Sequence, residues 1–337
     1  MLFYLLVLLV GLGLLVKASD SLIESAGRLA RILGVSELIV GLTIVAIGTS
    51  IPELASSVLA SLHGSGDLVI GNVIGSNVAN IGFVLAISLL FAPLAIDKQV
   101  MKRDALFLLF ASLALVFVLF GNVVSRLEGI FLLLLFIAYF TFLFRTKKRY
   151  REQYGFPDFL NYFLRSEYLR ELTESSAAII SDMGQKIVVD KRVLRELLLV
   201  FAYSIGVIVG AELLVTSALK LSSTFNINAS FIGITIIAMG TSLPELSVSI
   251  SAIKRNKGGI LIGNIIGSGI TNIFLVVGLS AIVSELSIAS ILFRTALIAL
   301  AFIIFFIVML FYKKSLDRLD AFVLLTLYAI FIAQAYG

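Results

Sequence analysis

Ten apolar segments, most of them long enough to cross a lipid bilayer as a helix, recur along this chain of 337 residues. A membrane-spanning helix needs about 20 predominantly apolar residues. The chain is 60% hydrophobic and 14% charged, whereas soluble domains carry about 25% charged residues. We therefore expect an all-α integral membrane protein with ten transmembrane helices. The expected segments are 2–16, 37–61, 68–95, 105–120, 128–144, 194–219, 229–252, 259–283, 291–312 and 320–336.

Residue types that are missing or rare exclude several kinds of site. The chain has no cysteine and one histidine, so disulfides, zinc–thiolate sites and histidine metal sites are excluded. His63 lies in the short polar stretch LHGSGD and is expected to be a solvated loop residue. The sequence contains no intramembrane nucleophile–base pair, so we expect neither an enzyme nor a bound cofactor.

Basic residues indicate how the chain is oriented, because Lys and Arg concentrate in cytoplasmic loops. They gather in the links at 98–103, 145–151, 254–257 and 313–318, whereas the links at 63–67, 121–128 and 284–294 hold at most one each. We therefore expect an inner (plasma) membrane protein with both termini outside. The net charge of +5 then reflects cytoplasmic loops and not a nucleic-acid partner. The apolar N-terminus lacks a basic start and a small-residue cleavage pattern, which favours a first transmembrane helix over a removed signal peptide.

One motif occurs twice, and this repeat divides the chain. AIGTSIPE ends at Glu53 and AMGTSLPE ends at Glu245, 192 residues later. From Gly41 to Val84, about half of the residues are identical under this offset, without a gap. Similarity between unrelated apolar helices would match Leu with Ile, but would not reproduce a Gly-Thr-Ser-x-Pro-Glu motif. The chain therefore contains an internal repeat.

Each half holds five expected spans, so the second half enters the membrane from the opposite side. The sequence thus predicts two inverted five-helix repeats at 1–144 and 194–337, with their most similar parts at about 37–95 and 229–283. Secondary transporters commonly have this architecture, with the substrate site between the repeats at the midplane of the bilayer.

A proline and a carboxylate inside an apolar span indicate a broken helix that binds a cation. Pro52 and Pro244 each remove one backbone hydrogen bond and clash with a carbonyl four residues back. Free carbonyls at membrane depth are tolerated only when they are buried or line a cavity. The neighbouring oxygens belong to Thr49, Ser50, Thr241, Ser242, Glu53 and Glu245. Such a set, without nitrogen or sulfur, suits hard cations such as Ca²⁺ or Na⁺.

Two charged glutamates in the membrane need compensation, because a charge at a helix centre costs roughly 2.5–3.5 kcal/mol on insertion scales. A divalent cation between Glu53 and Glu245 would supply it. The alternative is a kinked helix whose glutamate pairs with a basic residue, but the sequence has no Lys or Arg near the middle of a span.

A second motif follows each of the first, as GNVIGSNVANI and GNIIGSGITNI. Its glycines permit close helix packing. Its polar residues recur every four positions and so share one helix face. These residues either complete the shell of the cation or only form hydrogen bonds between helices. They are Asn72, Ser76 and Asn80 in the first copy and Asn264, Ser268 and Asn272 in the second. Asp20 and Glu212, which also match under the offset, stay outside the predicted site.

The only hydrophilic linker, 145–193, is expected in the cytoplasm. Phe156, Phe159, Leu160, Phe163 and Leu164 recur in it at helical spacing, which predicts a short amphipathic helix, either on the membrane surface or within a solvated connector.

The paired motifs resemble the two α-repeats of the sodium/calcium exchanger family, within the calcium/cation antiporter superfamily. The resemblance implies exchange of Na⁺ for Ca²⁺ by alternating access, without an obligatory protein partner. It also implies that Glu53 and Glu245 are shared central ligands and that Thr49 and Thr241 offer backbone carbonyls to Ca²⁺. The flanking Na⁺ sites would involve Ala46, Ser50, Ser76, Ala238, Ser242 and Ser268, with Asn80 and Asn272 beside the centre.

Other couplings remain open at this point. Ca²⁺ neutralises two carboxylates and so do two protons, so calcium/proton exchange is an alternative, as is exchange of another pair of cations. The additional neutral oxygens favour Na⁺. A channel is disfavoured, because spans 4, 5, 9 and 10 hold few polar residues. In the family, an acid at the position of Asn272 accompanies potassium-dependent exchange, so asparagine argues against it. The linker is too short for the calcium-sensing domains of animal exchangers.

Overall fold

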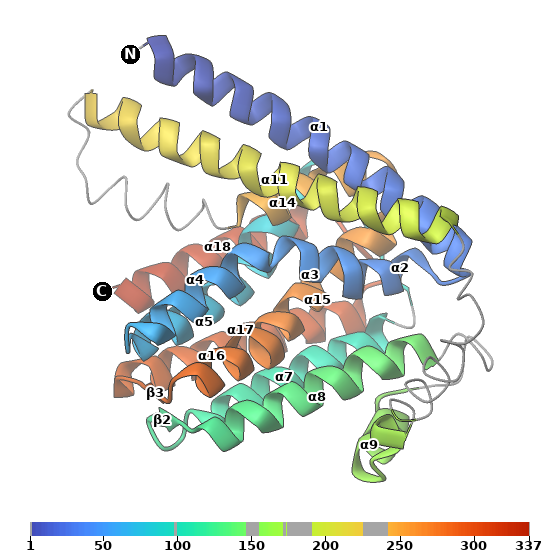
Figure 1. The fold of residues 1–337 in the computed structure, drawn as a ribbon, viewed down its shortest axis with the longest axis vertical. Helices are drawn as coiled ribbons and strands as arrows, with labels where there is room; N and C mark the ends of the chain where they lie inside the picture. Colours follow the sequence, from blue (N-terminus) through green and yellow to red (C-terminus); the bar gives the residue numbers. More distant parts are fainter. Residues whose placement is uncertain are drawn as a thin grey trace.

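The computed structural model describes residues 2–97, 100–145, 155–170, 173, 191–224 and 242–336. Within these residues the chain is almost wholly helical, with four two-residue strands and four short π-helical segments, labelled η (Figure 1). The elements of the first half are α1 (Leu2–Leu33), α2 (Glu37–Val40), η1 (Gly41–Val45), α3 (Ala46–Thr49), α4 (Ile51–Leu62), α5 (Gly66–Ala79), η2 (Asn80–Leu85), α6 (Ala86–Phe91), β1 (Leu94–Ala95), η3 (Val100–Asp104), α7 (Ala105–Val118), β2 (Val123–Val124) and α8 (Arg126–Arg145). They are followed by α9 (Phe156–Leu164), α11 (Lys191–Thr224), α14 (Leu243–Lys254), α15 (Gly258–Thr271), η5 (Asn272–Val277), α16 (Gly278–Val283), β3 (Leu286–Ser287), α17 (Ser290–Tyr312), β4 (Ser315–Leu316) and α18 (Arg318–Tyr336).

The same elements recur 192 residues later, as the sequence repeat predicts. The bounds of α4, α5, η2, α6 and β1 all shift by this number to give those of α14, α15, η5, α16 and β3. The strand β2 shifts in the same way to β4, and the start of α8 to that of α18. The halves therefore share their local structure as well as their motifs.

Six described helices are long and apolar enough to cross a membrane, or seven if a bent pair counts as one span. The expected bounds of two spans were too short. The first, predicted at 2–16, runs through all of α1, and the sixth, predicted at 194–219, runs through α11. The charged second half of α1 stays helical because its side chains have ionic partners, such as Arg255 for Asp20 at 3.2 Å.

Arg103 differs from the sequence expectation, which places it in a cytoplasmic loop. It lies in η3, which is continuous with α7, and is only 4% exposed. Its guanidinium lies 2.7 Å from the carboxylate of Asp104, which is fully buried. The neighbouring carboxylate makes burial of this arginine possible, since a buried charge needs a partner.

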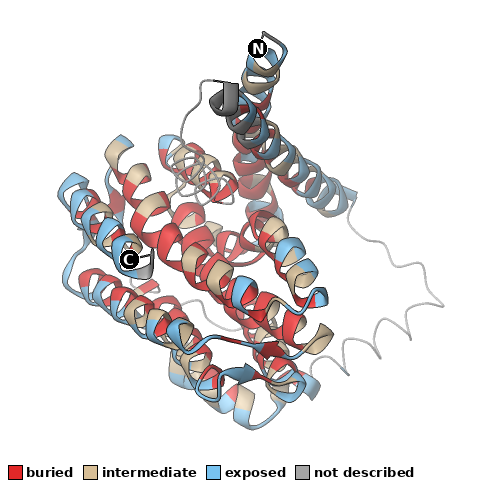
Figure 2. Ribbon diagram, turned by 90° about the vertical axis from the view of Figure 1, so that its left-hand side faces the viewer, coloured by how far each residue is buried: buried red, intermediate tan, exposed pale blue. Residues whose placement is uncertain are grey.

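The centre of the molecule is formed by the two repeated motif regions, and the helix pair α1–α11 lies against one side (Figures 1 and 2). In the apolar window of Gly258–Val283, 94% of residues are buried, compared with 28% in that of Lys191–Leu213. Helices of both halves of the chain therefore enclose α15 and its neighbours. In contrast, α11 exposes a large apolar surface, as a lipid-facing helix does.

The four strands join the two halves at two places. β1 pairs with β4 and β2 pairs with β3, both antiparallel. Each pair thus takes one strand from each half, and the offset of 192 that relates β1 to β3 also relates β2 to β4.

The amphipathic helix predicted in the linker is present as α9. Phe159 is buried, and its ring lies 4.7 Å from that of Phe107 on α7 and 5.5 Å from that of Phe142 on α8. The apolar face of α9 therefore packs on the helical bundle itself. Residues 146–154 and 174–190 of the linker lie outside the described residues.

Candidate functional site

The first motif breaks its helix at the predicted place. The segment Glu37–Thr49 and the helix Ile51–Leu62 meet at an angle of 47°, with Pro52 in the first turn of α4. Ser50, between them, has φ −84° and ψ 5°. Ser242, before α14, has φ −91° and ψ 3°, and Pro244 follows in the same position. The two copies of the motif therefore enter their helices in the same conformation.

Glu53 and Glu245 are buried in the first turns of α4 and α14, at 1% and 2% exposure. They are close enough to interact electrostatically. Neither glutamate forms an ion pair with a Lys or Arg in the described part of the chain. The alternative in which each glutamate pairs with a basic residue at a kinked helix therefore does not apply to these residues.

Several buried oxygens of the predicted site lack a hydrogen-bond partner among the described residues. They are Ser50 Oγ, Glu53 Oε2, Asn80 Oδ1, Glu245 Oε2 and Asn272 Oδ1. Buried polar atoms are nearly always satisfied, and leaving one unpaired costs about 1–3 kcal/mol. A hard cation would be coordinated by such oxygens. The donor set is therefore chemically suited to Ca²⁺ or Na⁺.

Thr49 connects the first motif of one half with the second motif of the other. Its hydroxyl donates to Asn264 Oδ1 at 3.1 Å and lies 3.4 Å from Ser268 Oγ. Thr49 is on α3, whereas Asn264 and Ser268 are on α15. All three are buried. Asn264 therefore serves as an interhelical hydrogen-bond acceptor, which is the second of the two roles expected for this residue set.

The asparagines of the second motif differ in role. Asn272 donates through Nδ2 to Asn77 Oδ1 at 3.3 Å, which leaves its own Oδ1 unpaired. Asn72, by contrast, donates to Ser57 Oγ at 3.1 Å and is only half-buried. Asn77, which the sequence analysis missed, is a buried interhelical donor at the site. Its equivalent position is Gly269 and not a polar residue, so the repeat gave no signal for it.

Glycines hold α15 close to the first motif. A Cβ on Gly263 would lie 2.6 Å from the carbonyl oxygen of Leu38, and one on Gly267 would lie 2.5 Å from that of Leu42. Close approach of this kind needs residues without a side chain. The glycines therefore bring α15, with Asn264 and Ser268, to the broken helix.

Ser204 of α11 is a second residue that the sequence analysis missed. It is buried, its Oγ has no partner among the described residues, and a Cβ on Gly48 would lie 2.6 Å from it. Ser112 and Ser88 instead donate to the carbonyl four residues back, as helical serines commonly do. Gly48 carries the carbonyl with which Pro52 conflicts, so Ser204 lies beside the helix break.

Ten of the twelve residues predicted to hold the ions are described, and every one of the ten is buried. They are Ala46, Thr49, Ser50, Glu53, Ser76, Asn80, Ser242, Glu245, Ser268 and Asn272. Ala238 and Thr241 lie outside the described residues. Within the described chain no group of three or more His, Cys, Asp or Glu side chains is placed to hold a metal, so two carboxylates and neutral oxygens form the whole donor set there.

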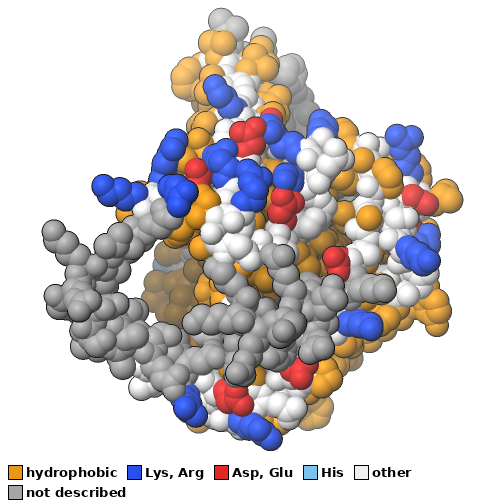
Figure 3. Space-filling view, turned by 90° about the vertical axis from the view of Figure 1, so that its right-hand side faces the viewer, with side chains coloured by type: hydrophobic (Ala, Val, Ile, Leu, Met, Phe, Trp, Pro, Cys, Tyr) orange, Lys and Arg blue, Asp and Glu red, His pale blue; other side chains and the backbone are white. Residues whose placement is uncertain are grey.

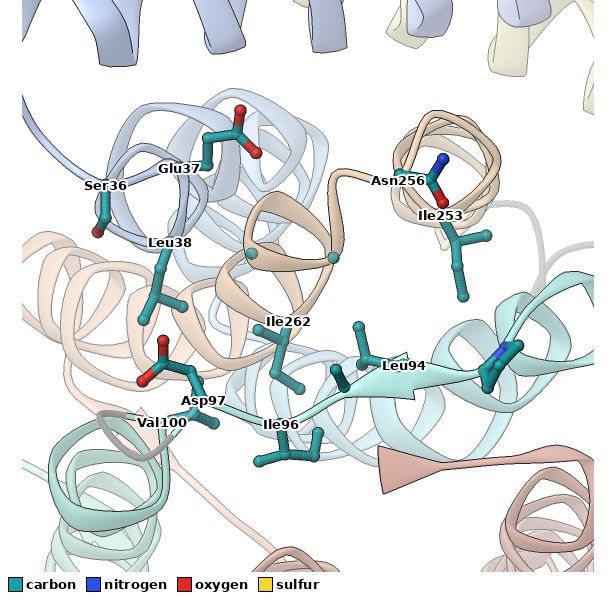
Figure 4. A pocket seen from close by; sticks show the side chains of 14 residues that line it. Ser36, Glu37, Leu38, Leu94, Ile96, Asp97, Val100, Ile253, Asn256 and Ile262 are labelled. Atoms are coloured by element: carbon teal, nitrogen blue, oxygen red, sulfur yellow. The ribbon is translucent and has the colours of Figure 1, made fainter. Parts of the chain in front are cut away.

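A separate cavity lies apart from these residues. It measures about 510 Å³ and is lined by the start of α2, the link after α6 and the turn between α14 and α15 (Figure 4). Glu37 and Asp97 are its carboxylates, and Glu37 forms an ion pair with Lys257. None of the predicted ion ligands lines this cavity.

Comparison with known proteins gives consistent matches over nearly the whole chain. The family model for the sodium/calcium exchanger protein matches residues 3–145 and 196–337. The sodium/calcium exchanger MaX1 of Methanosarcina acetivorans is 36% identical over 98% of this chain and 98% of its own length. The inner membrane protein YrbG of Escherichia coli is 34% identical over 82% of this chain and 79% of its own length.

A solved structure matches as completely. The sodium-calcium exchanger NCX_Mj, soaked with zero Na⁺ and Ca²⁺, superposes with a TM-score of 0.77 at 31% identity, over 98% of both chains.

Proposed function

Because the chain belongs to the sodium/calcium exchanger family, we propose that it is an antiporter that exchanges Na⁺ for Ca²⁺ by alternating access. The similar proteins MaX1 and NCX_Mj are named as exchangers of these ions. Na⁺ and Ca²⁺ are its transported substrates; it is not an enzyme, and it needs no cofactor or further protein chain.

The observation that carries the proposal is the pair of buried glutamates with unpaired oxygens. Glu53 and Glu245 come from equivalent positions of the two halves and interact with each other. Two carboxylates about 5 Å apart would repel by about 3 kcal/mol at an effective dielectric of about 20. A cation between them removes this repulsion and satisfies Oε2 of each, so the glutamates bind Ca²⁺ directly.

Neutral oxygens complete the proposed binding sites. Thr49 and Thr241 offer carbonyls to Ca²⁺, and Asn80 and Asn272 lie beside the centre. The remaining proposed ligands surround the Na⁺ positions and are Ala46, Ser50, Ser76, Ala238, Ser242 and Ser268. Support for this set comes from the burial of the described members and from the unpaired oxygens of Ser50, Asn80 and Asn272.

The proposed architecture is ten transmembrane helices in two inverted five-helix repeats, at 1–144 and 194–337, joined by a cytoplasmic linker at 145–193. The recurrence of elements at an offset of 192 supports it. So does the antiparallel course of α1 and α11, which are equivalent helices (Figure 1). The family model leaves out residues 146–195, which is close to the proposed linker.

The proposed location is the inner membrane, with both termini outside. The two termini lie at the same end of the molecule (Figure 1). Lys and Arg side chains gather on the opposite end, which is the end of α1 and the start of α2 (Figure 3). The similar YrbG is named as an inner membrane protein.

Ion flux in reconstituted vesicles tests the function. An outward Na⁺ gradient should drive accumulation of Ca²⁺, and a pH gradient alone should not. Uptake driven by protons without Na⁺ would instead support calcium/proton exchange. Ca²⁺ that moves down its own gradient without a counter-ion would indicate a channel.

Variants test the glutamates separately. Glu53→Gln and Glu245→Gln should each abolish Ca²⁺ transport while the protein still elutes as a folded species. Glu285→Gln, in an exposed link, is the matched control and should transport normally. Robust exchange by either of the first two variants would remove that residue from the site.

A further inference from the structure

A group of ion pairs fastens α1 to the end of α14. Arg255 lies 3.2 Å from the carboxylate of Asp20 and 2.5 Å from that of Glu24. Ser251, one turn before Arg255, also donates a hydrogen bond to Asp20. The hydrogen bond from Arg255 to Asp20 raises the pKa of this guanidinium above its ordinary value, so the contact is ionic at any physiological pH.

The contact involves the second half of α1, and α1 ends at the side of the molecule where Lys and Arg side chains gather (Figures 1 and 3). Arg28 adds an ion pair to Glu196 at 3.0 Å, which joins α1 to α11. At the proposed cytoplasmic end, the outer pair of helices is thus attached to the central helices.

The internal repeat assigns an equivalent to each member of the Asp20–Arg255 contact. An offset of 192 takes Asp20 to Glu212 on α11, and it takes His63 to Arg255. His63 and Arg255 are both the residues that end their helices, α4 and α14. Each is followed by a residue with positive φ, Gly64 at 69° and Asn256 at 56°. The two turns are therefore the same structure at opposite ends of the molecule.

The equivalent contact is not made in this structure. His63 is exposed, and its side chain has no hydrogen bond or ion pair with any described residue. Glu212 is also exposed, and among the described residues it accepts only from Thr216 on its own helix, at 3.1 Å. The fastened end, where Arg255 pairs with Asp20, is thus held by an ion pair, whereas the equivalent residues His63 and Glu212 at the other end are not in contact.

We propose that His63 and Glu212 form an ion pair in the opposite-facing state, when Arg255 has released Asp20. The proposal rests on the proposed function, because in an alternating-access protein built from inverted repeats the two repeats move against each other about the central site. When the two halves exchange conformations, α11 takes the place relative to α4 that α1 now has relative to α14. The same exchange brings Glu212 to His63.

The two bases differ in whether their charge depends on pH. Arginine stays charged, whereas histidine is the side chain whose charge can change near physiological pH. Two other carboxylates lie on or beside the elements packed around the end of α4: Asp67 at the start of α5 and Glu285 just after α16. Asp67 already accepts a hydrogen bond from the backbone of Ala289. Acid on the His63 side therefore stabilises the state in which that side is closed.

Apart from the contacts of Arg255, the ion pairs that join elements at the fastened end have no equivalent with two opposite charges. Arg28 and Glu196 correspond to Lys220 and Tyr4. Glu37 and Lys257 correspond to Ala229 and Ser65. Of the ion pairs at the fastened end, Asp20–Arg255 is thus the one whose equivalents, Glu212 and His63, are again an acid and a base.

Cysteine cross-linking tests the contact without measuring transport. The chain has no cysteine of its own, so a double variant carries the only two thiols. His63→Cys with Glu212→Cys should form a disulfide under copper phenanthroline, and Asp20→Cys with Arg255→Cys is its matched counterpart. Changing Na⁺ and Ca²⁺ on either side of the vesicle should raise one cross-link and lower the other.

Two outcomes would overturn the proposal. In one, the 63–212 pair never cross-links although the 20–255 pair does. In the other, both cross-links rise and fall together. Because neither readout requires Na⁺ to drive Ca²⁺, a failure of the proposed ion coupling would leave this test decisive.

The pH dependence is tested with charge variants. Lowering pH from 7.5 to 5.5 on the His63 side should raise the Ca²⁺ concentration for half-maximal uptake from that side about two- to fivefold more in the unchanged protein than in His63→Gln. An exposed ion pair supplies a shift of this size. His63→Arg should show the raised value at both pH values.

The reversed pair is the rescue. His63→Glu with Glu212→Arg should restore the raised Ca²⁺ concentration for half-maximal uptake, and this value should not depend on pH. Neither single change should restore it. An identical pH response in the unchanged protein and His63→Gln would show that protonation elsewhere causes it and would refute the proposed role of His63.

Discussion

The side-chain amide of Asn77 donates a hydrogen bond of 3.2 Å to the backbone oxygen of Gly269, the residue that stands 192 positions later. Equivalent positions of two related halves meet only where their symmetry axis passes. This contact therefore marks the centre of the molecule, between α5 and α15. Asn77 also accepts from Asn272, so it connects the centre with the proposed ion site.

Asn77→Ala should destabilise the protein more than a substitution of another asparagine on the same helix. It would leave the side-chain amide of Asn272 without its partner, at about 1–3 kcal/mol for an unsatisfied group. It would also remove the interhelical hydrogen bond to Gly269, whose carbonyl would keep only its backbone donor Asn272. The measurement is the midpoint of thermal unfolding in detergent. Asn72→Ala, which removes a half-buried hydrogen bond, is the control, and an equal midpoint for both variants would contradict the central role of Asn77.

Gly267→Ala should reduce the yield of folded protein. Its Cβ would lie 2.5 Å from the carbonyl oxygen of Leu42, and backbone atoms cannot move aside without separating α15 from η1. Size-exclusion chromatography and thermal unfolding measure the effect. Gly13→Ala on α1 has no atom within 4 Å of its Cβ and should stabilise the helix by about 0.5–1 kcal/mol. A normal yield of the Gly267 variant would show that the helices separate without cost.

Gly48→Ala should slow exchange because it pushes α11 away from the helix break. The new Cβ would lie 2.6 Å from Ser204 Oγ and 3.4 Å from Ser204 Cβ. Ser204→Gly in the same chain removes both contacts and should restore much of the rate, which vesicle flux measures. If the double variant is no faster than Gly48→Ala, the loss comes from the backbone at the break and not from α11.

Potassium should leave the rate of Na⁺-driven Ca²⁺ uptake unchanged, because Asn272 is neutral where an acid accompanies potassium dependence in related exchangers. The rate is compared with K⁺ or choline on both sides of the vesicle, and Asn272→Asp is examined under the same conditions. A strict requirement for K⁺ in the unchanged protein would show that this residue does not decide the coupling.

The sequence predicted the fold well wherever a physical pattern repeats. The offset between the two motifs carries over to helix after helix, and Pro52 breaks its helix where the missing backbone hydrogen bond requires it. The helical spacing of Phe156, Phe159, Leu160, Phe163 and Leu164 predicted α9. These signals are local or periodic, so they can be read without knowing the partners.

Features that depend on a distant partner were not predictable. α1 extends to Leu33 because Arg255, more than 200 residues away, neutralises its acids. Asn77 has no polar equivalent, and Ser204 is one serine among many until Gly48 lies against it. Arg103 looked like a loop residue, since its burial is possible only beside Asp104.

The pairing of β1 with β4 and of β2 with β3 has a consequence for biosynthesis. Each strand of the first half finds its partner only in the second half, more than 160 residues further along the chain. A nascent chain that ends before Leu286 therefore holds two strands without their partners. If it also ends before Arg255, the acidic residues of α1 lack their ionic partner. The first half completes its tertiary structure only after the ribosome has delivered the second, and until then membrane lipid and insertion factors must cover its exposed surfaces.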